Sequence, residues 1–429
     1  MRQQIEVRHP ARIVRLRLHP SPPEEQTISQ ASGQPDPRKR HLLLDPNLQL
    51  ICTISMMAMI GTGIVSPALP TIQKALQVES GSIGLLMAVF TFPGIIFIPL
   101  TAVLADRYGR KPVIVPLLLL YGLAGGFSFL APDFDTLLVL RFLAGIGASS
   151  LGSLTMVLVG DKFELAQQPA VFGYRLAMGQ VANGVVPPIA GALAIVGWQF
   201  PFLLYFLAVP VGLITLYAME EDKPAQRSSL RQYLVETGQG LGNPRMLGLM
   251  SVVLTLTMIN HGITLTFLPI FMADSFHASA LTIGLILSVR IVVGAGMAAL
   301  MGHLSARFSG EILISLSLGA LCLSLVWLPL VNSVWGMIGP AILAGGATGV
   351  GFPAFQSLLV RAAPADVRAG VMAANSVMGR IGQTAGPVLA GPLFVLGGAN
   401  LLFIVGALFI VVMWVLLHLA LRRPSGNEN

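Results

Sequence analysis

The sequence predicts an all-α membrane protein in which twelve transmembrane helices form two pseudo-symmetric bundles of six. Of its 429 residues, 54% are hydrophobic and only 10% are charged, against about 25% charged in an ordinary soluble domain. Twelve apolar runs follow one another, and each can cross a bilayer as a helix of about 20 residues. The second half of the chain also repeats the first. This composition excludes a soluble enzyme, a nucleic-acid-binding protein and a secreted disulfide scaffold.

The apolar runs and the polar segments between them define the expected domains. Residues 1–46 are basic and proline-rich without helical periodicity, so we expect a disordered cytoplasmic tail. A polar cytoplasmic linker at 219–245 separates a first bundle, 47–218, from a second, 246–421, and residues 422–429 form a second cytoplasmic tail. The expected spans are approximately 48–70, 82–104, 112–131, 136–159, 170–195, 200–218, 246–272, 280–302, 311–331, 335–359, 369–396 and 400–421.

Lysine and arginine are distributed unevenly between the two sides of these spans. With the N-terminus on one side, 21 of the 26 basic residues fall on that side, and only Lys74 falls on the other. This bias follows the positive-inside rule. We therefore expect a multi-pass protein of the cytoplasmic (inner) membrane with both termini in the cytoplasm and the lipid bilayer as its solvent.

The internal repeat relates the two halves at an offset of 200 residues. It pairs identical residues in several spans, among them Ile83 with Ile283, Gly84 with Gly284, Gly145 with Gly345, Pro187 with Pro387 and Gly191 with Gly391. Six spans per half make the repeats parallel, related by an axis along the membrane normal. Two such halves can rock around a site between them, which is alternating access.

The loop after the second span carries a charged motif. It reads Ala102-Val103-Leu104-Ala105-Asp106-Arg107-Tyr108-Gly109-Arg110-Lys111, and its second-half copy keeps Arg307 but has Ala306 in place of the acid. Gly109 permits a tight turn. Asp106 could meet a helix N-terminus or an arginine across the interface between the halves. The alternative is a solvated loop that only sets the topology.

This motif resembles the loop signature of the major facilitator superfamily, with Ala102 at the usual first glycine. With the twelve spans and the repeat, the resemblance covers residues 48–421 and implies the major facilitator fold. It also implies a gating role for the loop, with Asp106, Arg107, Gly109, Arg110, Lys111 and Arg307 as the expected gating residues.

Two further motifs narrow the resemblance to exporters. Arg141 in the fourth span resembles the arginine that is associated with proton coupling in proton-linked members. The alternative is an arginine bound to backbone carbonyls at a helix bend, or one that extends outward to the surface. The fifth span resembles the antiporter signature through Gly184, Pro187, Pro188 and Gly191. Small residues permit close helix approach and prolines bend the helix. Residues 92–160 look like the twelve-span drug:proton antiporter group, which includes bacillibactin-type siderophore exporters.

Four arginines lie inside spans, whereas no Asp or Glu lies deep in one. Arg290 and Arg380 fall near the bilayer midplane, where a charge usually marks a pathway. Arg175 is closer to a helix end and is expected to extend to the surface. Guanidinium groups suit carboxylate, catecholate or phosphate oxygens, so the charge balance favours an anionic cargo. The alternative for Arg290 and Arg380 is a structural tie between helices.

The expected substrate or proton pathway combines these arginines with polar side chains of the same spans. His261 could carry the coupled proton near neutral pH, or serve only as a neutral hydrogen-bonding group. The full set of expected pathway residues is Arg141, Arg290, Arg380, His261, Asn260, Gln180, Asn183 and Gln383.

The sequence thus predicts a proton-driven exporter of small amphipathic or anionic molecules, such as drugs or siderophore-like metabolites. The alternatives are an organic-anion importer or exchanger, and a lipid flippase or transporter-like receptor. The cysteines, Cys52 and Cys322, offer no metal-ligand spacing. We expect no enzymatic site, cofactor, metal or nucleic acid, and a monomeric protein whose partners are its small-molecule substrate and protons.

Overall fold

A computed structural model of the chain describes residues 44–220, 244–363 and 368–422, together with Leu42, Val235 and Gly238. Nearly all of the expected tail at 1–46, most of the expected linker at 219–245 and residues 423–429 lie outside this described part. The chain divides into two units, Met1–Leu43 and Leu44–Asn429, and every transmembrane element belongs to the second.

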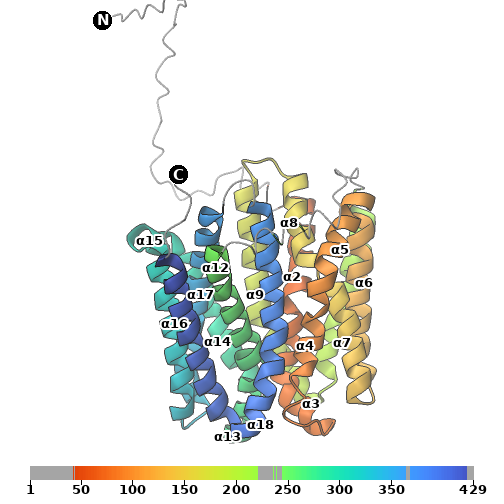
Figure 1. Ribbon diagram of the computed structural model, residues 1–429. Helices are drawn as coiled ribbons and strands as arrows, with labels where there is room; N and C mark the ends of the chain where they lie inside the picture. Colours follow the sequence, from red (N-terminus) through yellow and green to blue (C-terminus); the bar gives the residue numbers. More distant parts are fainter. Residues whose placement is uncertain are drawn as a thin grey trace, which may run out of the picture. The chain divides into compact units, whose positions relative to one another are not determined.

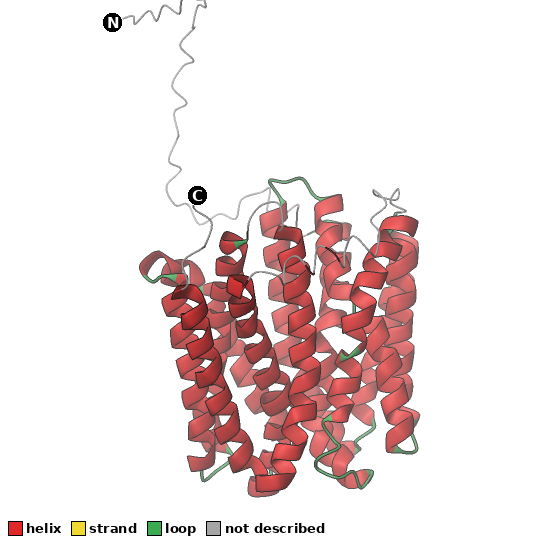
Figure 2. Cartoon of the chain, in the orientation of Figure 1, coloured by secondary structure: helices red, strands yellow, loops and turns green. Residues whose placement is uncertain are grey.

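Every regular element in the described part of the chain is a helix (Figure 2). The first half contains α2 (Pro46–Val65), η1 (Ser66–Ala68), α3 (Leu69–Ala75), α4 (Leu85–Thr91), α5 (Pro93–Tyr108), α6 (Lys111–Phe127), η2 (Ser128–Leu130), α7 (Phe134–Ala148), α8 (Leu151–Lys162), α9 (Gln168–Val196), η3 (Phe200–Leu207) and α10 (Ala208–Ala218). The second half contains α12 (Pro244–Met258), η4 (Ile259–Phe267), α13 (Leu268–Phe276), α14 (Ala280–Ala299), α15 (Met301–Arg307), α16 (Gly310–Trp327), η5 (Leu328–Leu330), η6 (Trp335–Met337), α17 (Ile338–Ala362) and α18 (Arg368–Arg422).

These elements form twelve spans, as the sequence predicts. Eleven helical segments are long and apolar enough to cross a membrane, and the last of them, Gly370–Leu419, is 50 residues long. Non-helical backbone at Gly397 and Gly398 divides that segment into two helices, and Gly398 has φ of 66°. A left-handed φ suits glycine because it has no Cβ. The chain therefore turns back here to form the eleventh and twelfth spans.

Several spans are not continuous α-helices, and this differs from the prediction. The first is interrupted at Ser66–Ala68, the second at Phe92 and the fourth between Ala148 and Leu151. The sixth span begins as a 3-10 helix over Phe200–Leu207, and the seventh contains a π-helical segment over Ile259–Phe267. Proline lies near each of these breaks except the one between Ala148 and Leu151; it removes a backbone N–H donor and restricts the residue before it. π-helical turns are frequent at functional sites.

The helices run between two ends, which Figure 1 shows at the top and bottom. The loop between α5 and α6 and the short helix α15 lie at the upper end, called here the basic end, whereas α3 and α13 lie at the lower, opposite end. Side-chain caps fix where helices begin. The Asp133 side chain accepts from the Thr136 N–H at the start of α7, and the Ser279 side chain accepts from the Thr282 N–H at the start of α14. The hydrogen bonds of Thr136 lower the pKa of Asp133 below its usual value.

The two halves repeat each other in packing as well as in sequence. A Cβ at Gly145 would meet the carbonyl of Phe90, and a Cβ at Gly345 would meet the carbonyl of Arg290, which is 200 residues beyond Phe90. Gln77 and His277, also 200 residues apart, both have φ of 51°. The internal repeat is therefore confirmed as two similar bundles of six spans.

The close contact between Gly145 of the fourth span and the backbone of the second span leads to a stability prediction. Gly145→Ala places a methyl group against the α4 backbone, which cannot rotate away as a side chain can, so we expect a loss of about 1–3 kcal/mol. The control is Gly152→Ala in the same span, where nothing lies within 4 Å; it should be neutral or stabilising by up to about 1 kcal/mol. Thermal unfolding in detergent measures both. Equal effects of the two variants would show that the close contact is unimportant.

Candidate functional site

The two halves are sealed against each other by two pseudo-symmetric helix pairs. In the first pair, α4 and the loop before it contact α18: Gly84 lies against the Pro387 carbonyl, and Gly391 lies against Gly81. In the second pair, α14 contacts α9: Gly284 lies against the Pro187 carbonyl, and Gly191 lies against Ala280. We call these two contacts the seal. Gly84 and Gly284 lie at or near the starts of α4 and α14, which directly follow α3 and α13, so the seal is toward the opposite end (Figure 1).

Hydrogen bonds between the halves accompany the seal. Thr91 and Thr384 hydroxyls lie 3.0 Å apart and join the first helix pair. The other three bonds end on backbone carbonyls: Ser66 Oγ to Leu265 O at 2.6 Å, Ser288 Oγ to Gly184 O at 2.6 Å, and Arg380 Nη2 to Ser149 O at 2.9 Å.

These carbonyl acceptors are set free by breaks in the helices that carry them. In a regular α-helix, the carbonyl of residue i accepts from the N–H of residue i+4. Gly184 has Pro188 four positions on, and proline has no N–H. Leu265 lies in the π-helical segment, where the α-helical pattern is interrupted, four positions before Pro269. Ser149 lies in the break between α7 and α8. The opposite half therefore supplies donors that the carbonyl's own helix lacks.

The contacting faces of α9 and α14 separate toward the basic end. Along α9, Pro187 and Gly191 are buried, but Gln180, one turn from Gly184 on the same face, is exposed. A Cβ at Gly173, farther along, would have nothing within 4 Å. Along α14, Ser288 is buried whereas Val292 is 64% exposed. The halves are thus closed together near the opposite end and diverge toward the basic end.

Arg380 lies at the edge of the seal and reaches from one half to the other. Its Nη2 donates to the Ser149 carbonyl, and its Nη1 donates to Gln383 Oε1 at 3.2 Å. The absence of a side chain at Gly94 makes room for it, because a Cβ there would lie 2.9 Å from Arg380 Cδ. Among the four arginines inside spans, this is the one with a hydrogen bond across the halves in the described structure.

Other polar side chains lie at about the same depth in the bundle as Arg380. Gln180 is the repeat counterpart of Arg380 and is exposed, and Asn183 on the next turn is half-buried. The structure therefore brings Gln180, Asn183, Arg380 and Gln383 to corresponding heights of α9 and α18, on the basic side of the seal.

His261 and Asn260 lie in the π-helical segment of the seventh span. His261 Nδ1 lies 3.2 Å from the Thr257 carbonyl, to which it can donate, and 3.4 Å from Asn260 Nδ2, from which it can accept, depending on the tautomer. Asn260 Oδ1 is buried without a hydrogen-bond partner in the described structure.

Arg141 is buried within the first-half bundle. It is 0% exposed, and its guanidinium carbon lies 4.0 Å from the centre of the Phe90 ring. Its Nη1 donates to the Tyr205 hydroxyl, which in turn donates to the Gly61 carbonyl. These contacts tie spans one, two, four and six together.

Arg175 does not extend to the surface, so that expectation is wrong. It is 5% exposed, and its Nη1 lies within 3.4 Å of the hydroxyls of Ser55 and Thr155. These hydroxyls on α2 and α8 offer hydrogen bonds inside the bundle, which the sequence alone did not reveal.

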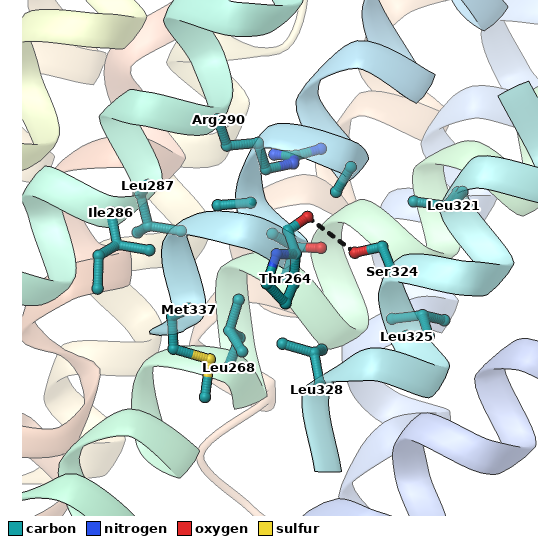
Figure 3. A pocket seen from close by; sticks show the side chains of 13 residues that line it. Thr264, Leu268, Ile286, Leu287, Arg290, Leu321, Ser324, Leu325, Leu328 and Met337 are labelled. Atoms are coloured by element: carbon teal, nitrogen blue, oxygen red, sulfur yellow. Dashed lines mark hydrogen bonds between the residues drawn. The ribbon is translucent and has the colours of Figure 1, made fainter. Parts of the chain in front are cut away.

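Arg290 extends from α14 into the interior of the second-half bundle (Figure 3). It is 8% exposed and lines a small cavity with residues from η4, α16 and α17. It does not lie at the seal with Arg380, so the two midplane arginines that the sequence pairs occupy different places.

The charged loop between α5 and α6 forms ion pairs within the first half. Arg110 donates to Asp106 and, at 3.2 Å, to Asp161 at the end of α8. Burial opposes the charge of Arg110, but these hydrogen bonds outweigh it and raise its pKa. Gly109 has φ of 95°, which confirms the tight turn. Arg107 and Arg307 are exposed and Lys111 is half-buried. The acid–arginine pair of this conformation thus lies inside the loop.

Sequence reasoning missed the residues that join the halves at the seal, namely Ser66, Thr91, Ser149, Ser288 and Thr384. Small hydroxyl residues are common in membrane helices, so their type alone carries little information. A usable signal is the proline four residues after Gly184, which marks a free carbonyl in that helix.

Comparison with known proteins identifies relatives along the whole membrane region. Residues 51–270 and 250–429 each match the family model of the Major Facilitator Superfamily. "Multidrug resistance protein 1" of Bacillus subtilis is 27% identical over 357 residues, which cover 81% of this chain and 89% of that protein. The "Bacillibactin exporter" of the same organism is 29% identical over 163 residues, covering 36% of this chain and 40% of that protein.

A solved structure shares the fold at low sequence identity. It is a bacterial homologue of the human lysosomal transporter Spinster in an inward-facing and occupied conformation, with a TM-score of 0.71 and 15% identity, covering 91% of this chain and 98% of that one.

The buried arginine of the loop gives a second prediction. Arg110→Gln leaves the carboxylates of Asp106 and Asp161 without this partner, so we expect a loss of about 1–3 kcal/mol in unfolding free energy. Arg107→Gln removes the same charge from an exposed position in the same loop and should stay within about 0.5 kcal/mol of the parent. Thermal unfolding with a denaturant series compares them. A loss no larger for Arg110→Gln than for Arg107→Gln would contradict a structural role for the loop ion pairs.

Proposed function

Because the chain belongs to the Major Facilitator Superfamily, we propose that this multi-pass membrane transporter exports small anionic or amphipathic molecules in exchange for protons by alternating access. The observation that carries the proposal is Arg380, a cation that joins the two halves at the inner edge of the seal. Export is supported by the names of the relatives above, which include a multidrug resistance protein and a bacillibactin exporter.

The orientation follows from the positive-inside rule. The basic end faces the cytoplasm, in the cytoplasmic membrane, and both termini lie on that side. The helix pairs that form the seal then close the outer side, while the exposed faces of α9 and α14 open toward the cytoplasm. This conformation accepts a substrate from inside the cell.

A bound substrate can replace the Ser149 carbonyl as the acceptor for Arg380 and so break this hydrogen bond between the halves. Arg380 now donates to the Ser149 carbonyl, a neutral acceptor. A carboxylate or catecholate oxygen is a stronger acceptor, because charge-assisted hydrogen bonds are roughly twice as strong as neutral ones. An anion that takes over Arg380 releases Ser149 and removes one tie between the halves. Gln180, Asn183 and Gln383 supply further hydrogen bonds at the same level.

The proton is carried by His261 in this proposal. In the tautomer in which Nδ1 donates to the Thr257 carbonyl, Nε2 is available to accept a proton. In antiport the anion and the proton bind in alternation, so His261 takes up its proton from the outer side after the anion has left Arg380, and releases it on the cytoplasmic side before the next anion binds.

The alternative functions are an organic-anion importer or exchanger, and a lipid flippase or transporter-like receptor. An organic-anion importer or exchanger would also bind its substrate at Arg380, but would run in the opposite direction in a pH gradient or would need no gradient. A lipid flippase would move labelled phospholipid between the leaflets of a vesicle, and a receptor would bind without moving substrate.

The arginine at the seal gives the principal test. In proteoliposomes with an imposed pH gradient, the parent protein should move a catecholate anion, and Arg380→Gln should reduce this flux by about tenfold or more, because a charge-assisted hydrogen-bond pair is lost. Arg380→Lys keeps the positive charge but lacks the planar guanidinium, so its flux should lie between those of the parent protein and Arg380→Gln. Arg361→Gln, which removes an exposed charge in the last turn of α17, is the matched control.

The same assay includes a cationic dye as a second substrate. Dye flux in the parent protein together with no catecholate flux would exclude an anionic cargo. Catecholate flux that is equal in Arg380→Gln and Arg361→Gln would exclude Arg380 from the pathway.

The histidine gives a test of coupling. One proton per cycle at 100 mV supports roughly a fifty-fold gradient of a neutral solute. His261→Gln should abolish accumulation driven by the gradient while leaving exchange of labelled for unlabelled substrate, because exchange needs no net proton movement. His303→Gln, an exposed histidine at the basic end, should keep both activities. Undiminished accumulation by His261→Gln would show that another group carries the proton.

A further inference from the structure

Arg290 is a buried cation without a partner in the described part of the chain. It lies in the middle of α14 and is 8% exposed. Its Nε is buried and unbonded, and no hydrogen bond or ion pair joins its guanidinium to any residue that the structure describes. A buried guanidinium with unused donors requires an acceptor.

The repeat explains why Arg290 lacks the contacts that hold its counterpart in the first half. There, Arg141 fills the interior and stacks on Phe90, with Tyr205 as its hydrogen-bond acceptor. In the second half, Phe90 is replaced by Arg290, while the positions of Arg141 and Tyr205 hold Ala341 and Val405. The cation has moved to the neighbouring helix, and the side chains that would fill the space and accept its hydrogen bonds are missing.

The space left by these replacements is a cavity of about 20 Å³. Arg290 extends over it from α14, and Thr264 and Ser324 approach it from η4 and α16 (Figure 3). Ser324 uses its proton for the Pro340 carbonyl at 2.9 Å. The Thr264 hydroxyl has no hydrogen bond to the described residues, so it can donate into the cavity. Apart from backbone groups, the remaining lining side chains are apolar: Leu268, Ile286, Leu287, Leu321, Leu325, Leu328, Met337, Pro340, Ala341 and Ala344.

The size and chemistry of this cavity select a narrow class of ligand. A water needs about 10–15 Å³, whereas drug-sized molecules need about 300 Å³ or more, so a cavity of about 20 Å³ suits a single atom or a very small group. Its free donors are a guanidinium and a hydroxyl, and no described Asp or Glu lies at this depth to neutralise the charge. Water could accept the hydrogen bonds but would leave the charge uncompensated.

We propose that Arg290 and Thr264 hold a small monovalent anion of chloride size inside the second-half bundle. This site is separate from the transport pathway proposed at Arg380. The anion compensates the buried charge and joins η4 to α14, so it stabilises the second half in its folded form.

Labelled chloride and purified full-length protein test this proposal without any transport substrate or gradient. Sodium chloride is exchanged for sodium gluconate at constant ionic strength, and bound chloride is measured by equilibrium dialysis alongside the unfolding midpoint. The parent protein should bind one chloride per chain saturably, and its unfolding midpoint should rise with chloride concentration. Both Arg290→Met and Ala341→Leu, which fills the cavity and keeps the arginine, should weaken binding by about tenfold or more.

The control is Arg307→Met, which changes the net charge equally at an exposed position and should bind chloride as the parent does. No saturable binding by the parent protein would show that the cavity holds only water and would overturn the proposal. Binding that survives Ala341→Leu would place the ion elsewhere and would overturn it as well, even if Arg290→Met does not fold. Because no transport is measured, these results are independent of the role of Arg380.

Discussion

The need to satisfy backbone carbonyls in an apolar medium determines how the two halves meet. A carbonyl without a hydrogen bond is strongly unfavourable in the bilayer interior, so every break in a helix demands a substitute donor. Here the substitutes come from the opposite half: the free carbonyls of Gly184, Leu265 and Ser149 are met by Ser288, Ser66 and Arg380. The seal is thus made of helix defects, and separation of the halves must provide each carbonyl with another donor.

This arrangement suits a protein that changes conformation. The described halves are joined by four hydrogen bonds and by glycine contacts, rather than by a cluster of ion pairs. A typical hydrogen bond contributes about 0.5–1.5 kcal/mol net, so the interface is within reach of the binding energy of a small molecule. The glycines allow backbones to touch without interlocking side chains, and surfaces of this kind can separate without repacking either bundle.

Much of the fold could be predicted from the sequence because its signals are long-range and redundant. Twelve apolar runs, the 200-residue repeat and the bias in basic residues all predict one architecture, and Gly397–Gly398 divides the last two spans as expected. The arrangement of the candidate site was harder to predict from the sequence. Arg290 and Arg380 are equivalent in depth along the sequence, but helix rotation sends one into a bundle and the other to the seal. Rotation depends on packing, which the short-range pattern of an almost uniformly apolar helix does not record.

The four arginines within spans have different surroundings in the two halves, and these surroundings determine what each arginine contacts. The first half gives Arg141 an aromatic ring and a phenol, and gives Arg175 two hydroxyls, so both cations are accommodated within one body. The second half has Ala341 and Val405 where the first has Arg141 and Tyr205, so Arg290 is left with a cavity and Arg380 turns to a carbonyl of the other half. Among the described residues, the first bundle therefore supplies hydrogen-bond acceptors to both of its arginines, whereas in the second bundle Arg290 has none and Arg380 uses Ser149 of the other half. In the chloride site proposed above, an anion supplies the counter-charge that Arg290 lacks among the described residues.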